Sequence, residues 1–202
     1  MDRFAINAEL LKGHNDFIAR VLIMPGHKRT ASRNGKWTPA QHLEHILRAV
    51  RPVAIALLVP KWFLRWRFGK PNRIPRTYDE LVQRYKERLA EGGKASGRFV
   101  PPAVPADQVE RMTVSLSSLA HTLTQRVRTW TEDDLDSVLL PHPLLGKLTV
   151  REMLFFTVYH VQHHRAPYRP GHQRLPGLSR LLLRVRQGHH HGVGTLEAKA
   201  LR

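Results

Sequence analysis

Apolar residues recur every three to four positions along several long segments of this chain. Such spacing is typical of amphipathic helices that pack against a core, whereas the alternation typical of strands is scarce. We therefore expect an all-α protein. The two clearest apolar stripes occupy positions 43, 46, 47, 50, 53, 54 and 57, and positions 109, 112, 116, 119, 120, 123 and 127.

Turn and cap residues suggest where the first and third long helices begin and end. The first runs from near Phe4 to Met24, where a Pro-Gly pair follows, and it contains Gly13 as a weak point. The third begins at Asp107, which is a suitable N-cap, and continues to about Trp130.

The second long helix has clear signals at its start. Thr38 is a suitable N-cap, and Pro39 fits the first helical position because its missing N–H costs nothing there. Pro52 should kink this helix, and Pro60 should stop or bend it.

The last helix is expected over residues 150–166. Thr149 and Glu152 have the spacing of a capping box, and Pro167 ends the helix. A short charged helix is expected over residues 78–90. The loops are residues 68–77, 91–106 and 142–147.

These elements predict an all-α helical bundle with a basic C-terminal extension. We expect residues 1–166 to form the bundle and residues 167–202 to form a disordered tail. The net charge is +17, and the segment 165–202 holds eight Lys and Arg against one acid. The body is therefore moderately basic, and no aromatic-basic interleaving accompanies this charge, so nucleic acid is not the expected partner.

The composition also limits the compartment and the chemistry. Cysteine is absent, which excludes disulfides, thiolate metal sites and cysteine nucleophiles and suits a reducing cytoplasm. No run of about 18 apolar residues occurs. The nearest, residues 53–66, is interrupted by Pro60, Lys61 and Arg65. We expect a soluble, cytoplasmic protein with no membrane partner.

Histidines carry the candidate chemistry. His160 and His164 are four residues apart, so on a helix both side chains leave the same face, at a spacing that lets two imidazoles share one ion. His163 points in a different direction. Two histidines at this spacing are weak evidence of a metal site by themselves, because surface histidines are also found four residues apart. The apolar residues around this pair favour a buried site.

The second helix offers a third ligand. His45 lies within the apolar stripe, whereas His42 lies nearer the polar flank, so we favour His45, with a hydrogen-bonded core histidine as the alternative. Glu44 is either a carboxylate that supports the site or a solvated surface residue. Arg165 is either an anion-binding or an exposed arginine.

Three motifs together resemble the DinB-like family of metal-dependent four-helix bundles. The first is a Trp-Thr helix start with a histidine eight residues after the tryptophan; the second is His-Pro-x-x-Gly-x-Leu-Thr-x-x-Glu; the third is His-x-x-His-His on the last helix. Their residues are Trp37, Thr38 and His45; His142, Pro143, Gly146, Leu148, Thr149 and Glu152; and His160, His163 and His164.

The resemblance covers roughly residues 37–165 and implies a four-helix up-and-down bundle. It also implies one divalent ion, nickel or zinc, held by His45, His160 and His164. It further implies thiol-dependent S-transferases and a maleylpyruvate isomerase as wider relatives. The first helix looks short for this family, and the tail extends past its usual end. His189, His190 and His191 lie in that tail and are not counted as a site.

Two function hypotheses follow. Three neutral imidazoles leave a coordination position open, as in catalytic sites, so the first is a metalloenzyme of the thiol-dependent S-transferase or hydrolase kind. The second is a metal-stabilised bundle that binds a ligand or partner without catalysis. We expect a low-molecular-weight thiol or another small molecule as the substrate, and a homodimer is left open.

Overall fold

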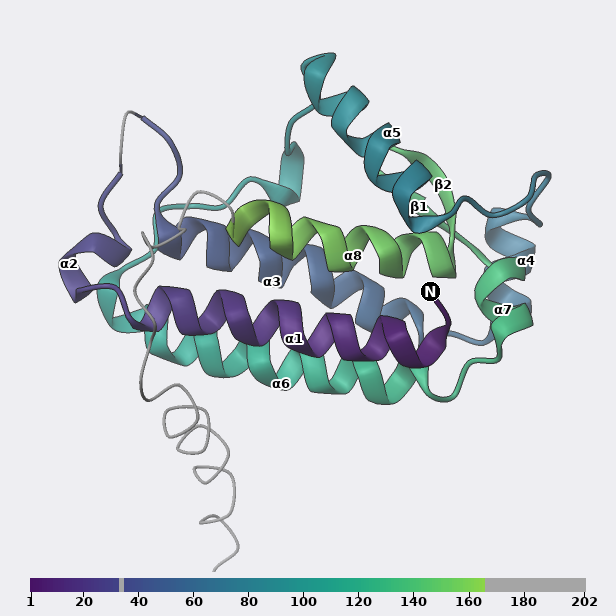
Figure 1. The fold of residues 1–202 in the computed structure, drawn as a ribbon, viewed down its shortest axis with the longest axis horizontal. Helices are drawn as coiled ribbons and strands as arrows, with labels where there is room; N and C mark the ends of the chain where they lie inside the picture. Colours follow the sequence, from purple (N-terminus) through teal and green to yellow (C-terminus); the bar gives the residue numbers. More distant parts are fainter. Residues whose placement is uncertain (33–34, 166–202) are drawn as a thin grey trace, which may run out of the picture. The chain divides into compact units, whose positions relative to one another are not determined.

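The computed structural model describes residues 1–32 and 35–165, so the predicted tail, residues 167–202, lies outside the described residues. Four long helices form a bundle (Figure 1), which confirms the expected all-α fold. These are α1 (Arg3–Leu22), α3 (Pro39–Ala56), α6 (Val109–Val127) and α8 (Val150–Arg165). The shorter elements are α2 (Gly26–Arg29), α4 (Lys61–Phe68), α5 (Tyr78–Ala90), α7 (Glu132–Ser137), β1 (Leu139–His142), β2 (Gly146–Thr149) and two 3₁₀ turns, η1 (Gly97–Phe99) and η2 (Ala106–Gln108).

Each long helix packs mainly against two neighbours, in the cyclic order α1, α6, α3, α8. The helices do not simply alternate in direction: α1 and α8 run one way, and α3 and α6 run the other (Figure 1). The indole of Trp130, just after α6, donates to the carbonyl of Leu57, just after α3, at 3.2 Å. The long connection over residues 57–108, which carries α4 and α5, returns the chain to the end of the bundle where α3 began.

One apolar core fills the bundle, and all four long helices contribute to it. Gly13 lets α1 and α8 approach closely, because a Cβ there would lie 3.0 Å from Cγ1 of Val161. Helix α1 continues through Gly13 without interruption, and its 20 residues match the helix expected from near Phe4 to Met24 closely. Among the described residues, no helix is long and apolar enough to cross a membrane.

The predicted cap is confirmed at α3 and wrong at α6. Thr38 accepts from the N–H of Gln41 and Gln41 accepts from that of Thr38, at 3.1 and 3.0 Å. Asp107 does not cap α6: it lies in the preceding 3₁₀ turn η2, and α6 begins after Gln108 with no side-chain cap bond.

Two elements differ from the sequence-based expectation. Pro60, which predicts the end of the second long helix, is itself the N-cap residue of α4, a short helix with Leu64 buried and Trp62 and Trp66 exposed. The segment expected as a loop over 142–147 is mostly hairpin, since β1 and β2 pair antiparallel around a tight turn. Both elements are too short for a sequence period to reveal them.

Glu152, in the first turn of α8, is fully buried and holds the α4–α5 connection against the bundle. It completes the predicted capping box with Thr149, at 2.9 and 3.2 Å. Both its oxygens also accept from the guanidinium of Arg73, at 2.7 and 2.8 Å, and Oε1 accepts from the backbone and side chain of Arg76. Burial raises the pKa of Glu152, but these hydrogen bonds lower it overall.

Replacing Glu152 by Gln should destabilise the fold by about 1–3 kcal/mol at neutral pH, because a buried charged hydrogen-bond network is broken. The pKa of Glu152 is lower in the folded chain than its ordinary value of 4.5, so its contribution is complete above that value and is lost as the pH falls through the folded pKa. Urea denaturation of both proteins at several pH values should show a difference that shrinks below about pH 4.

The matched control for this test is Glu80→Gln, because Glu80 occupies the same capping-box position at the exposed start of α5. Its effect should be smaller than that of Glu152→Gln. Equal stability of the parent and Glu152→Gln at neutral pH would contradict the role of this carboxylate. So would a stability difference between them that stays the same in acid.

Candidate metal centre

Two antiparallel helices bring the predicted histidines together. The capping box at Thr38 sets the start of α3, which places His45 in its second turn. His160 and His164 occupy successive turns near the end of α8. Because α3 and α8 run in opposite directions, the start of one lies against the end of the other.

The three imidazoles are buried and converge. The Nε2 atom of His160 lies 3.0 Å from Nε2 of His45 and 3.0 Å from Nε2 of His164. One ligand atom from each residue lies within 4.8 Å of the others, and all three residues are buried. In the part of the chain that the structure describes, this is the one group of three or more His, Cys, Asp or Glu residues with such a geometry.

The tautomer of His45 follows from its backbone partner. Its Nδ1 lies 2.7 Å from the carbonyl oxygen of Phe99 in η1. A carbonyl oxygen only accepts, so Nδ1 carries the proton and donates it. The Nε2 atom of the neutral ring is then left with a lone pair that faces His160, which is the orientation of a metal-ligating histidine.

His42 contacts His164 but lies outside the cluster formed by His45, His160 and His164. The Nδ1 atoms of the two rings lie 2.8 Å apart. Trp37 covers the same region, with its ring centroid 5.6 Å from that of His42 and 5.0 Å from that of His45. Of the two candidates that the sequence offers on this helix, the structure brings His45 into the group and gives His42 a place where it can orient His164.

Electrostatics keep the cluster neutral. Burial first, and then the neighbouring histidines, hold the pKa of His160 and of His164 well below the ordinary value of 6.5. Burial also lowers the pKa of His45, although the bond to Phe99 opposes the shift. Neutral imidazoles are the form that ligates metals.

The donor set fits a divalent metal ion. His45 has its proton on the far nitrogen and so presents a lone pair to the cluster, as a metal ligand does. In a tetrahedral zinc site with Zn–N distances of about 2.0–2.1 Å, ligand nitrogens lie roughly 3.3 Å apart. The two separations that involve His160 are 3.0 Å and need only a small outward shift to match, and all three ligand atoms lie within 4.8 Å of one another.

Other polar residues that the sequence suggested have different roles. His163 is outside the group, and its ring packs against those of Tyr85 and Tyr159, at 6.0 and 6.2 Å between centroids. Glu44 pairs with Arg48 at 2.6 Å, and Arg165 pairs with Asp16 at 2.6 Å. Neither Glu44 nor Arg165 is therefore directed at the cluster by these contacts.

His142 ends β1 and lines the cavity beside the cluster. Its Nδ1 accepts from the backbone N–H groups of Leu144 and Leu145, at 3.2 and 3.0 Å. Its ring packs against Phe156, 4.2 Å between centroids, and burial lowers its pKa to about 4. The neutral ring therefore carries its proton on Nε2.

His14 on α1 is a buried polar residue that the sequence analysis missed. It is fully buried, and its Nδ1–H donates to the carbonyl of Leu10 at 2.6 Å, while Nε2 has no hydrogen-bond partner among the described residues. Burial lowers its pKa to about 4, against a smaller opposing effect of the Leu10 bond. The available signal was its place on the apolar face of the first helix, between Leu10 and Phe17.

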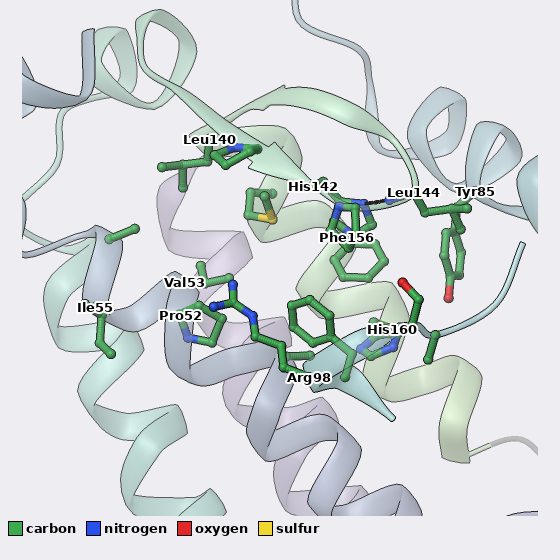
Figure 2. A pocket seen from close by; sticks show the side chains of 18 of the residues that line it. Pro52, Val53, Ile55, Tyr85, Arg98, Leu140, His142, Leu144, Phe156 and His160 are labelled. Atoms are coloured by element: carbon green, nitrogen blue, oxygen red, sulfur yellow. Dashed lines mark hydrogen bonds between the residues drawn. The ribbon is translucent and has the colours of Figure 1, made fainter. Parts of the chain in front are cut away.

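A cavity of about 730 Å³ reaches the cluster. His45 and His160 form part of its wall, together with His142, Tyr85 and Phe156 (Figure 2). Most other lining residues are apolar and come from α3, α4 and β1. A cavity of this size and character next to convergent polar groups is typical of a small-molecule site.

The family comparison agrees with this geometry. Residues 25–166 match the family model described as the DinB superfamily. This chain belongs to the DinB superfamily. The matched range contains α3, α6 and α8, whereas most of the described chain before it is α1, the fourth long helix of this DinB-superfamily bundle. The comparisons with curated proteins and with solved structures gave no match.

Replacing His14 by Leu should make stability less sensitive to acid. The folded pKa of about 4 lies below the ordinary value of 6.5, so as the pH falls between these values the unfolded chain takes up the proton first and the parent loses up to about 3 kcal/mol. Denaturation curves at several pH values should therefore fall less steeply for His14→Leu. Identical pH dependence in the two proteins would contradict this account of His14.

Proposed function

We propose that this DinB-superfamily protein is a divalent-metal-dependent enzyme of the thiol-dependent S-transferase or hydrolase kind. In this proposal His45, His160 and His164 ligate nickel or zinc, and a small molecule occupies the adjoining cavity. The convergence of three buried imidazoles, two of which line that cavity, carries the proposal. Three imidazoles leave a coordination position for a reactant, which a closed structural site lacks.

A bound divalent ion would lower the pKa of a thiol or water and so supply a nucleophile at neutral pH. The chain's own residues orient the ligands: Phe99 fixes the ring of His45 through its carbonyl, and His42 does the same for His164. Both supports would persist when the reactant enters, because they lie on the far sides of the rings.

Two cavity residues can donate hydrogen bonds and are poorly suited as general bases. The lone pair of His142 on Nδ1 is occupied by two backbone N–H groups, and Nε2 keeps its proton. Burial raises the pKa of Tyr85 to about 12, so its hydroxyl also keeps its proton. Both side chains are therefore suited to hold a polar substrate group rather than to remove a proton.

A second candidate function is a metal-stabilised bundle without catalysis. The observation that favours it is that the three ligands come from two different helices, so an ion would join α3 to α8 and add its binding free energy to the folded state alone. The cavity favours the first proposal, since a purely structural site does not need one.

Replacing any of His45, His160 and His164 by Ala should reduce bound metal from about one ion per chain to near zero, because a three-ligand site loses its geometry with any one ligand. His42→Ala should weaken metal binding roughly 10- to 100-fold, because His164 loses the partner that orients its ring. His163→Ala is the matched control and should retain the parent stoichiometry.

Metal analysis after dialysis measures this series. The full chain should carry Asn in place of His189, His190 and His191 in every protein compared, because those histidines could hold metal by themselves. Metal retention by His45→Ala equal to that of the parent would remove His45 from the ligand set.

Catalysis is tested by incubating the metal-loaded protein with an electrophile and each of several low-molecular-weight thiols. We expect turnover that a chelator abolishes, that added nickel or zinc restores, and that His164→Ala lacks. Ester hydrolysis without a thiol tests the hydrolase form in the same way. Full metal occupancy with no turnover in either assay would favour the non-catalytic alternative.

A further inference from the structure

The cavity beside the histidines has two ends of different chemistry. From His45 to Ala56, the wall formed by α3 is roughly 16 Å long at 1.5 Å per residue. At the histidine end the lining includes Tyr85. At the other end most of the lining is apolar, and the apolar residues there are Ala56, Val59, Leu64, Phe68, Leu140 and Met153.

Figure 2 shows the same division. Pro52, Ile55 and Leu140 lie to one side of the cavity, together with the guanidinium of Arg98, and Tyr85 and His160 lie to the other. An elongated ligand can therefore extend from Arg98 over a wall of apolar side chains. Burial of its apolar part stabilises the complex in proportion to the apolar area removed from water.

Among the described residues, all charge on the cavity wall is positive. The charged residues that line it are Lys94 and Arg98, and no described lining residue is a carboxylate. Neither side chain is in an ion pair among those that the described residues form. Unpaired cations over a low-dielectric wall favour an anionic ligand group.

The backbone of Arg98 is tied to α3 near the histidines, and its guanidinium points along the cavity wall toward Pro52 and Val53 (Figure 2). The carbonyl of Arg98 accepts from the guanidinium of Arg48 at 3.0 Å, and the next carbonyl, that of Phe99, accepts from His45. Both bonds tie the η1 turn to α3, so the Arg98 side chain starts from a fixed point next to the cluster. Its planar guanidinium suits a carboxylate, which it can bind through two parallel hydrogen bonds.

We propose that the cavity binds an elongated apolar molecule with a single carboxylate end, with the carboxylate at Arg98 and the apolar chain along α3 towards α4. This class of ligand rests on the proposed function as its substrate class. A small anion would leave the apolar wall uncovered, and an uncharged chain would leave the guanidinium of Arg98, which packs on the ring of Phe99 at 5.1 Å from the centroid, without an anionic partner.

Calorimetric titration of the full chain with decanoate, decanol and acetate tests the proposal directly. Decanoate should bind at one molecule per chain, about tenfold or more tightly than decanol, since a hydrogen-bonded charge pair is added. Acetate should not bind measurably, because it has no chain to bury. Decanol that binds as tightly as decanoate, or decanoate that fails to bind, overturns the proposal.

Two variants locate the carboxylate. Arg98→Ala should weaken decanoate binding about tenfold and leave decanol binding unchanged, because Arg98 is exposed and its removal should not disturb the fold. The matched control is Arg51→Ala, an exposed arginine of α3 that does not line the cavity and should behave like the parent. Equal losses in the two variants, or no loss in Arg98→Ala, contradict the assignment.

A third variant locates the chain. Ala56→Trp should fill the apolar end and abolish binding of both ten-carbon ligands; if circular dichroism shows that it is misfolded, the arginine pair still decides the outcome. Intact decanoate binding without turnover by the metal-loaded protein would contradict the proposed function alone. Turnover without decanoate binding would contradict the ligand class alone.

Discussion

The meeting of three imidazoles inside a bundle is the constraint on which the rest of the site depends. Three neutral rings turn the same nitrogen toward one point, and burial keeps them from taking up protons. The proton of His45 is committed to Phe99, so its lone pair faces the other two rings. The arrangement is therefore best satisfied by a cation, and the packing of α3 against α8 serves to hold it in place.

Both ends of the bundle contribute to this arrangement. At the start of α8, the buried carboxylate of Glu152 gathers Arg73 and Arg76 and so fixes the connection that leads into α5. At the end of α8, His42 and Trp37 close over the cluster from the start of α3. Between these points α4, η1 and β1 form walls of the cavity. Because α4 and η1 belong to the long connection between α3 and α6, that connection contributes to the site.

The sequence predicted the features that depend on neighbours in the chain. Periodicity predicts α3 and α6, the capping residues Thr38 and Thr149 predict where α3 and α8 begin, and the spacing of His160 and His164 predicts that they share a face. Their roles as metal ligands, with His45, remain a prediction that the geometry supports. Membership of the DinB superfamily is confirmed by the family match.

Features that depend on distant parts of the chain were not predictable in the same way. The partners of Glu152 lie more than seventy residues away, and the contact between His42 and His164 spans over a hundred. The cavity is assembled from segments that show no shared pattern, and α4 is too short to show a period of its own. Asp107 looked like a cap by type alone, but the turn that precedes α6 moved the helix start beyond its reach.

The central claim is that three imidazoles from α3 and α8 bind one divalent ion. X-ray absorption spectroscopy of the zinc- or nickel-loaded full chain, with His189, His190 and His191 replaced by Asn, reads the coordination shell itself. The account predicts nitrogen or oxygen ligands, at about 2.0–2.1 Å for zinc, with the outer-shell scattering of three imidazoles. A shell with no more than one imidazole, or one that is unchanged in His160→Ala, would contradict it.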